Sequence, residues 1–100
     1  MSMTIHKPVK VYVAVQADFN VDGILLPRII TWEDGEKFTI DKITDIRQAP
    51  AMKAGGQGDR YTIIIKGKQS YLFFERSTNL TGNYIGRWFV ERRHQSAQQY

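Results

Sequence analysis

Cysteine is absent from the 100-residue chain. Its absence excludes a disulfide framework, cysteine-ligated zinc and thiol catalysis. Apolar runs such as Ile24–Leu26 and Ile63–Ile65 are far shorter than the roughly 18 residues that a membrane span needs. The first residues also lack the apolar stretch of a signal peptide, so the sequence predicts a cytoplasmic protein with no membrane partner.

Helical periodicity is missing as well, because no segment repeats apolar residues at helical spacing over three turns. The length is that of one domain, and 42% of the residues are hydrophobic, which is enough for a modest core. We therefore expect a single small β domain over residues 1–93. The remaining residues, 94–100, are polar and rich in glutamine, and we expect them to form a disordered tail.

Alternation of apolar and polar residues is the strongest pattern that is present. It runs from Val9 to Phe19 and is typical of a strand with one buried face. Similar patterns and turn signals predict six strands in all, over residues 9–19, 24–32, 37–47, 60–66, 69–76 and 84–93. In the third strand the apolar face changes, which indicates a bulge or bend near Asp41 and Lys42.

Six short strands joined by frequent turns favour an all-β fold, either a small barrel or a strongly bent antiparallel sheet. We expect an SH3-like barrel, with an OB-like barrel as the alternative. Pro27 has no N–H to donate, so we expect it at a sheet edge or a strand start. Gly86 interrupts an apolar strand and indicates a close approach of another chain segment.

Several local motifs extend from Pro27 to Val90. They are Pro27–Ile30, Trp32–Gly35, Ile40–Ile43, Asp45–Ala49, Lys53–Gly58, Arg60–Thr62, Tyr71–Glu75 and Trp88–Val90. In these motifs the chain resembles a family of short bacterial proteins of unknown function, mostly from Gram-positive lineages. The polar insert over residues 77–83 is longer than the turn that this resemblance implies. Because the family has no assigned activity, the resemblance implies a free-standing small domain and carries over no site residue.

Positive charge is concentrated in the second half of the chain. Residues 1–50 hold six Lys or Arg against seven Asp or Glu, whereas residues 51–100 hold eight against three. Aromatic residues make up 12% of the chain, and both faces of the predicted strand 69–76 carry large apolar groups. One aromatic set outside the core would then form a surface for a nucleic acid or for a protein. The alternatives are a mildly basic surface and aromatic residues that simply fill the core.

A glycine-rich loop is the other local feature. Gly55, Gly56 and Gly58 lie between Lys53 and Arg60. Backbone N–H groups in such turns form anion-binding nests, and the flanking cations would add charge. The loop leads into a strand rather than a helix and lacks the Gly-Lys-Ser/Thr ending, so it is not a P-loop. A flexible connection between two parts of the sheet is the alternative.

These features favour a non-catalytic binding module with a nucleic-acid partner. A protein-interaction or self-assembly module, binding a protein partner or forming a homo-oligomer, is the alternative. The predicted ligand-binding residues are Lys53, Gly55, Gly56, Gly58, Arg60, Tyr61, Arg28 and Arg87. We expect no catalytic residue, no cofactor and no metal site, because the histidines lie near the chain ends and the aspartates follow no calcium-loop spacing.

Overall fold

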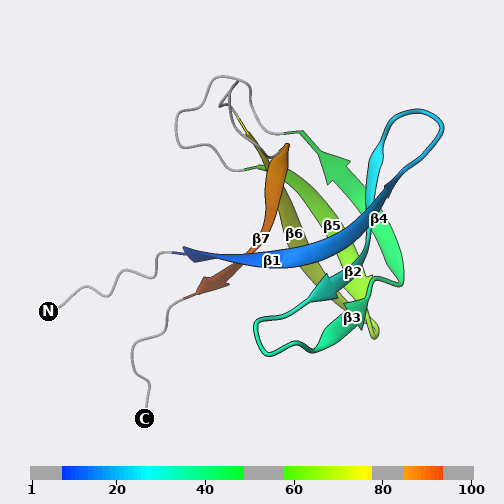
Figure 1. Cartoon of the computed structure of the whole chain (residues 1–100). Coiled ribbons are helices and arrows are strands. Elements are labelled where there is room, and N and C mark those ends of the chain that lie inside the picture. The colour runs from blue at the N-terminus through cyan, green and yellow to red at the C-terminus, as the bar shows by residue number, and fades with distance from the viewer. Residues whose placement is uncertain (1–7, 49–57, 78–84, 94–100) are drawn as a thin grey trace, which may run out of the picture.

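A computed structural model describes residues 8–48, 58–77 and 85–93. Within these ranges the chain forms strands only, and there is accordingly no helix that would be long and apolar enough to cross a membrane. The strands are β1 (Pro8–Phe19), β2 (Leu25–Thr31), β3 (Lys37–Thr39), β4 (Lys42–Arg47), β5 (Asp59–Ile65), β6 (Lys68–Arg76) and β7 (Gly86–Arg93). Together they form one curled antiparallel sheet, a half-barrel (Figure 1).

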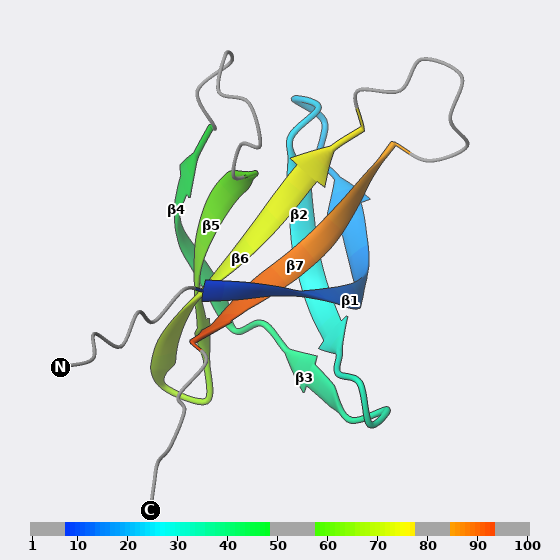
Figure 2. The same ribbon diagram turned by 90° about the vertical axis from the view of Figure 1, so that its left-hand side faces the viewer.

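The spatial order of the strands is β3-β2-β1-β7-β6-β5-β4. The long strand β1 belongs to two parts of the sheet, because residues 8–13 pair with β7 and residues 14–19 pair with β2. The smaller sub-sheet contains β2, β3 and the second half of β1, and the larger one contains the first half of β1 with β7, β6, β5 and β4. Figure 2 shows β1 crossing in front of the larger sub-sheet and curving towards β2.

The predicted third strand is in fact two strands. The Ile40 N–H donates to the Arg28 carbonyl oxygen, whereas the next residue, Asp41, donates its N–H to the Ile64 carbonyl oxygen, both at 2.8 Å. The chain therefore leaves β2 and joins β5 between two adjacent residues. The predicted position of the bend was right, but seven strands replace six because the bend is sharp enough to end one strand and start another.

The prediction of an all-β, strongly bent antiparallel sheet is confirmed. Each described strand pairs with its sequence neighbour, except across the bend after β3, and β1 pairs with β7. This arrangement is a meander, and it differs from the Greek key of an OB barrel. The alternative of an OB-like barrel is therefore wrong. The predicted tail over residues 94–100 lies outside the described residues.

Two bulges set which side chains face inward. One lies where β1 meets β2, since Gln16 pairs with Ile29 but Ala17 pairs with Pro27, which leaves Arg28 as the extra residue. As a result Ile30 is buried while Arg28 is exposed. The other bulge, at Thr44, lies between β4 and β5. Pro27 pairs with Ala17 of β1 on one side of β2. On the other side of β2, the pairing with β3 ends before it reaches Pro27, so the expected edge position is confirmed.

The core fills the concave side of the half-barrel. Phe74 and Trp88 are cross-strand partners whose rings lie 4.8 Å apart, and Tyr61 packs 5.3 Å from Trp88. The buried cluster contains Ile30, Ile40, Tyr61, Ile63, Leu72, Phe74 and Trp88. Burying large apolar side chains contributes roughly 1.5–3 kcal/mol each, so this cluster is the main source of stability.

Candidate functional site

A second aromatic group lies on the opposite side of the larger sub-sheet from this core. In register across the strands, Tyr12 of β1 faces Phe89 of β7, which faces Phe73 of β6, which faces Arg60 of β5. Because side chains alternate along a strand, this row lies on the face away from Trp88 and Phe74. We call it the outer face; its members include Lys10, Tyr12, Asp45, Arg47, Arg60, Tyr71, Phe73, Glu75, Arg87, Phe89 and Glu91.

Stacked aromatic rings form the centre of the outer face. The Phe73 and Phe89 rings are nearly parallel, with their centroids 5.0 Å apart, and Tyr12 meets Phe89 edge-on at 5.9 Å. Phe89 is fully buried, but Tyr12 and Tyr71 remain 40% and 42% exposed. Both open expectations hold in part, because Phe73 and Phe89 of this group are buried whereas Tyr12 and Tyr71 remain accessible.

Cations cover these rings. The Arg87 guanidinium lies 3.9 Å from the centroid of the Tyr12 ring, and the Lys10 ammonium lies 4.7 Å from that of Phe89. The Arg60 guanidinium lies 4.8 Å from the Tyr71 ring. Exposed cation–aromatic contacts contribute roughly 0.5–1 kcal/mol each, so they order the cations without removing them from solvent.

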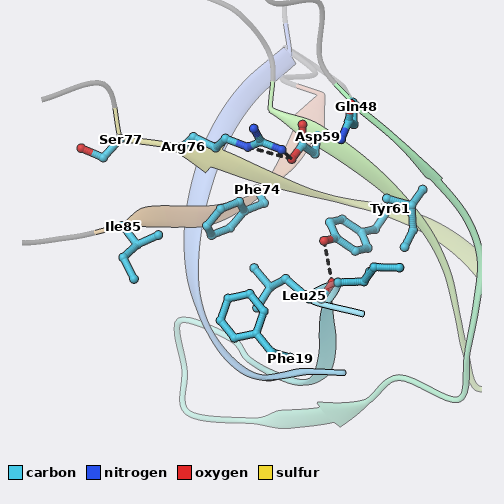
Figure 3. Close-up of a pocket in the computed structure, with 12 residues that line it drawn as sticks. Phe19, Leu25, Gln48, Asp59, Tyr61, Phe74, Arg76, Ser77 and Ile85 are labelled. Carbon is cyan, nitrogen blue, oxygen red and sulfur yellow. Dashed lines mark hydrogen bonds and ion pairs between the residues drawn. The ribbon is translucent and has the colours of Figure 1, made fainter. Parts of the chain in front are cut away.

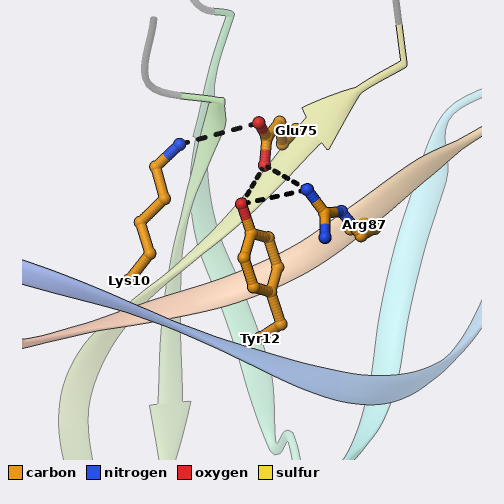
Figure 4. A network of polar contacts seen from close by, with 4 residues as sticks. All are labelled: Lys10, Tyr12, Glu75 and Arg87. Carbon is orange, nitrogen blue, oxygen red and sulfur yellow. Dashed lines mark hydrogen bonds and ion pairs between the residues drawn. The ribbon is translucent and has the colours of Figure 1, made fainter. Parts of the chain in front are cut away.

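One carboxylate holds the first two cations together (Figure 4). Glu75 accepts a hydrogen bond of 2.7 Å from the Tyr12 hydroxyl, which itself accepts one of 3.2 Å from Arg87 Nη2. Lys10 Nζ and Arg87 Nη2 lie 3.6 Å and 3.9 Å from the Glu75 carboxylate oxygens. Two positive charges are thus partly neutralised by one negative charge.

Arg60 is in a different situation from its neighbours. The other arginines whose side chains the structure describes are each ion-paired with a carboxylate; they are Arg28, Arg47, Arg76, Arg87 and Arg92. Within the described part of the chain, Arg60 has no such partner, and its buried Nε atom donates no hydrogen bond. Across the strands its register partner is Arg47, so two positive side chains lie directly opposite each other.

The structure brings together only some of the predicted site residues. Arg60 and Arg87 share the outer face, as just described. Arg28 lies on the smaller sub-sheet, where its Nε donates to Asp18 at 3.1 Å. Tyr61 is only 4% exposed and its ring packs in the core, so the structure does not bring it together with Arg60 on the outer face. Arg60 and Tyr61 are adjacent in a strand and therefore point to opposite faces.

The glycine loop is only partly within the described residues. Gly58 is included, and its lack of a side chain has a packing reason: a Cβ atom there would lie 2.3 Å from the Phe74 carbonyl oxygen. Gly86 is similar, since a Cβ would lie 2.5 Å from the Phe74 ring, which confirms the predicted close approach. The other predicted loop residues, Lys53, Gly55 and Gly56, lie outside the described residues.

Of the outer-face residues, only Arg60 and Arg87 were predicted as ligand-binding. Lys10 and Tyr12 are two positions apart on the polar side of the first strand, a signal that alternation alone could have supplied. Tyr71 was noted only as part of a two-sided aromatic strand. Arg47 meets Arg60 through a register that depends on the bulge at Thr44, and no pattern in the sequence specifies that register.

A cavity of about 440 Å³ lies at the open end of the half-barrel (Figure 3). We call it the mouth cavity. Tyr61 and Phe74 line its inner part, and the Tyr61 hydroxyl donates to the Leu25 carbonyl oxygen at 2.7 Å. Exposed apolar side chains also line it; they are Phe19, Ile24, Ile46 and Ile85. Burial raises the pKa of the Tyr61 phenol, with a smaller contribution from the charge of Asp59.

An ion pair lies beside this cavity. Arg76 Nη2 contacts the Asp59 carboxylate at 2.9 Å, and the Asp59 side chain is only 12% exposed. No three His, Asp or Glu side chains of the described segments lie close enough to hold a metal ion. Comparison with family models, with curated protein sequences and with solved structures found no match. The geometry of the two surfaces is therefore the basis for a functional argument.

Proposed function

We propose that this protein is a cytoplasmic, non-catalytic binding module whose outer face contacts single-stranded nucleic acid. The observation that carries the proposal is the row of cations stacked on aromatic rings, with two exposed tyrosines, on one face of a small half-barrel. Proteins that bind single strands combine positive charge along the backbone with rings on which bases stack. Arg87 adds a planar guanidinium that itself stacks on bases.

The arrangement supports contact without strict sequence preference. Tyr12 and Tyr71 each keep about two fifths of their surface exposed, and any base has a face that stacks on a ring. Lys10 on β1, Arg87 on β7 and Arg60 on β5 are spread across the larger sub-sheet, which suits the repeating phosphates of a single-stranded nucleic acid. Glu75 lies among them and repels phosphate, so it limits the affinity of the free face.

The test is a fluorescence-anisotropy titration of the protein against a labelled mixed-sequence single-stranded oligonucleotide, at low and at physiological salt. We expect binding that weakens with salt, with a slope of about 0.7 in log K per phosphate contacted. The Glu75→Gln variant removes the acid and should bind more tightly than the wild type. Arg87→Gln should bind less tightly. Arg28→Gln removes an arginine of the smaller sub-sheet and serves as the matched control, with unchanged affinity.

The gain expected for Glu75→Gln makes the test specific, since loss of folding cannot produce tighter binding. Absence of binding by the wild type at low salt, with RNA and with DNA, would reject the proposal. Equal losses for Arg87→Gln and Arg28→Gln would also reject it, because they would indicate a general charge effect with no defined face.

A protein partner is the second candidate, and the mouth cavity favours it. Exposed Phe19, Ile46 and Ile85 surround a hollow large enough for an apolar side chain. Addition of a partner strand to β2 is disfavoured, because Pro27 has no N–H and the Leu25 carbonyl already accepts from Tyr61. A partner would therefore insert a side chain. Light scattering tests self-association: a salt-insensitive oligomer that Ile46→Ser dissociates would support this candidate.

A further inference from the structure

We infer that Arg47 and Arg60 form an oxyanion site on the outer face, and that the group it takes is a phosphodiester of the bound strand. This inference rests on the proposed function and assigns a specific site to it. Arg47 is the last residue of β4 and Arg60 is the second residue of β5, and the two are register partners on the same face of the sheet. We expect the phosphodiester to bind to both guanidinium groups.

The first argument is charge. Like charges directly opposite each other on antiparallel strands destabilise the pair. Arg47 has Asp45 as a partner, at 3.1 Å, but this pair is exposed and two positions apart in the chain. Arg60 has no carboxylate partner among the described residues, in contrast to the other arginines whose side chains the structure describes. An anion held between the two guanidinium groups would turn a repulsive pair into an attractive one.

The second argument is orientation. The Arg60 guanidinium is held over the Tyr71 ring at 4.8 Å, and its Nε atom is buried without an acceptor. The terminal nitrogens are thus the donors that remain for a ligand. A guanidinium that is already ordered loses little freedom when it binds, and its planar fork matches two oxygens of a phosphate or carboxylate.

Phosphate is favoured over a carboxylate because of the neighbouring rings. Tyr71 lies beside Arg60, and Tyr12 lies farther across the same face, so a strand whose phosphate occupies the arginine pair would have rings within reach of its bases. Exposed ion pairs such as that of Arg47 with Asp45 are weak, so a phosphodiester should compete with it successfully.

The test uses ¹⁵N-labelled full-length protein and NMR with two probes, inorganic phosphate and a short mixed-sequence single-stranded oligonucleotide. We expect both probes to shift the signals of Arg47, Arg60 and Tyr71, with phosphate binding in the millimolar range. Arg60→Gln should abolish the phosphate shifts and lower the slope of log K against log salt for the oligonucleotide by about 0.7, which corresponds to one phosphate. Arg47→Gln should do the same to a smaller extent.

Two further variants test whether binding depends on the planar guanidinium of Arg60 or only on positive charge. Arg60→Lys keeps the charge but loses the fork, so we expect affinity between that of the wild type and Arg60→Gln. Arg28→Gln is the control and should leave both probes unaffected. A glutamate-rich peptide serves as a third probe, and shifts of Arg47 and Arg60 with this peptide alone would overturn the assignment to phosphate.

The outcomes distinguish the site from the function. If the oligonucleotide binds and the Arg47→Gln and Arg60→Gln variants retain the wild-type affinity and salt slope, the site is wrong and the proposed function stands. If phosphate shifts Arg60 but no oligonucleotide binds at low salt, the oxyanion site stands and its assignment to nucleic acid is overturned. If phosphate shifts neither residue and no oligonucleotide binds at low salt, both proposals are rejected.

Discussion

Replacing Tyr61 by phenylalanine tests how the two sub-sheets are held together at the open end of the half-barrel. Tyr61 lies on β5 in the larger sub-sheet, and its hydroxyl donates to the Leu25 carbonyl oxygen on β2 in the smaller one, at 2.7 Å. The variant keeps the buried ring and its packing on Trp88, so it creates no large cavity. It removes only the hydrogen bond between the sub-sheets.

The expected loss follows from the position of that bond. A typical hydrogen bond contributes roughly 0.5–1.5 kcal/mol, and leaving a buried acceptor unpaired costs roughly 1–3 kcal/mol. The bond is partly buried, so we expect Tyr61→Phe to lower the free energy of unfolding by about 1–2 kcal/mol. Each kcal/mol corresponds to a fall of about 4–8 °C in the melting temperature of a domain this size.

Urea denaturation followed by tryptophan fluorescence measures this loss. The slope of the free energy against urea should stay unchanged, because the surface exposed on unfolding is the same. Tyr71→Phe is the control: that hydroxyl is exposed and makes only a 3.4 Å contact with Gln69, so its loss should stay within about 0.5 kcal/mol. Equal effects of the two substitutions would refute the view that the Tyr61 bond joins the sub-sheets.

The pH dependence gives a second check on the same residue. Burial raises the pKa of Tyr61 in the folded protein, while an unfolded tyrosine ionises near its usual value of about 10. The folded state therefore holds this proton more tightly. The stability that Tyr61 contributes is complete below about pH 10 and is lost as the pH rises through the folded pKa. We expect the difference between wild type and Tyr61→Phe to narrow above about pH 10, and a constant difference would contradict this.

Two further substitutions test the packing. Gly86→Ala places a Cβ 2.5 Å from the Phe74 ring and 2.7 Å from the Glu75 carbonyl oxygen, so we expect a loss of about 1–3 kcal/mol in a urea titration; a neutral result would mean that β6 and β7 separate more easily than the structure indicates. Phe89→Ala removes a fully buried ring that stacks on Phe73, and calorimetry should show a loss of about 3–5 kcal/mol. A loss below 1 kcal/mol would mean that the outer aromatic group is not a second core.

Local patterns were sufficient to predict most of the strands. The fourth predicted strand, residues 60–66, differs by one residue at each end from β5, Asp59–Ile65. Gly35 lies between the predicted strands 24–32 and 37–47, and its positive φ of 90° is typical of an Asp-Gly turn. The bend after Ile40 was also located correctly, because the change of apolar face is a local signal. These features depend on neighbouring residues only, which is why the sequence contains enough information to predict them.

The arrangement of the candidate site depends on pairings over long distances in the chain. Tyr61 was grouped with Arg60 because they are adjacent, but the fold turns Tyr61 inward. Arg47 is the register partner of Arg60 only because Thr44 is an extra residue in β4. Lys10 of β1 reaches Glu75 of β6 only because a single strand, β7, separates these two strands. Bulges and the order of strands decide such contacts, and alternation of residue types specifies neither.

The division of β1 between two sub-sheets also has a consequence for how the chain folds. Its first half pairs with β7, so that Arg87 and Tyr12 are hydrogen-bonded across 75 positions of sequence. Contacts at such separations form slowly, and domains dominated by them fold in milliseconds to seconds. Until β7 inserts, β1 and β6 each present an unpaired edge to solvent, where neighbouring chains are able to add. β7 therefore protects β1, which is synthesised before it, from such addition.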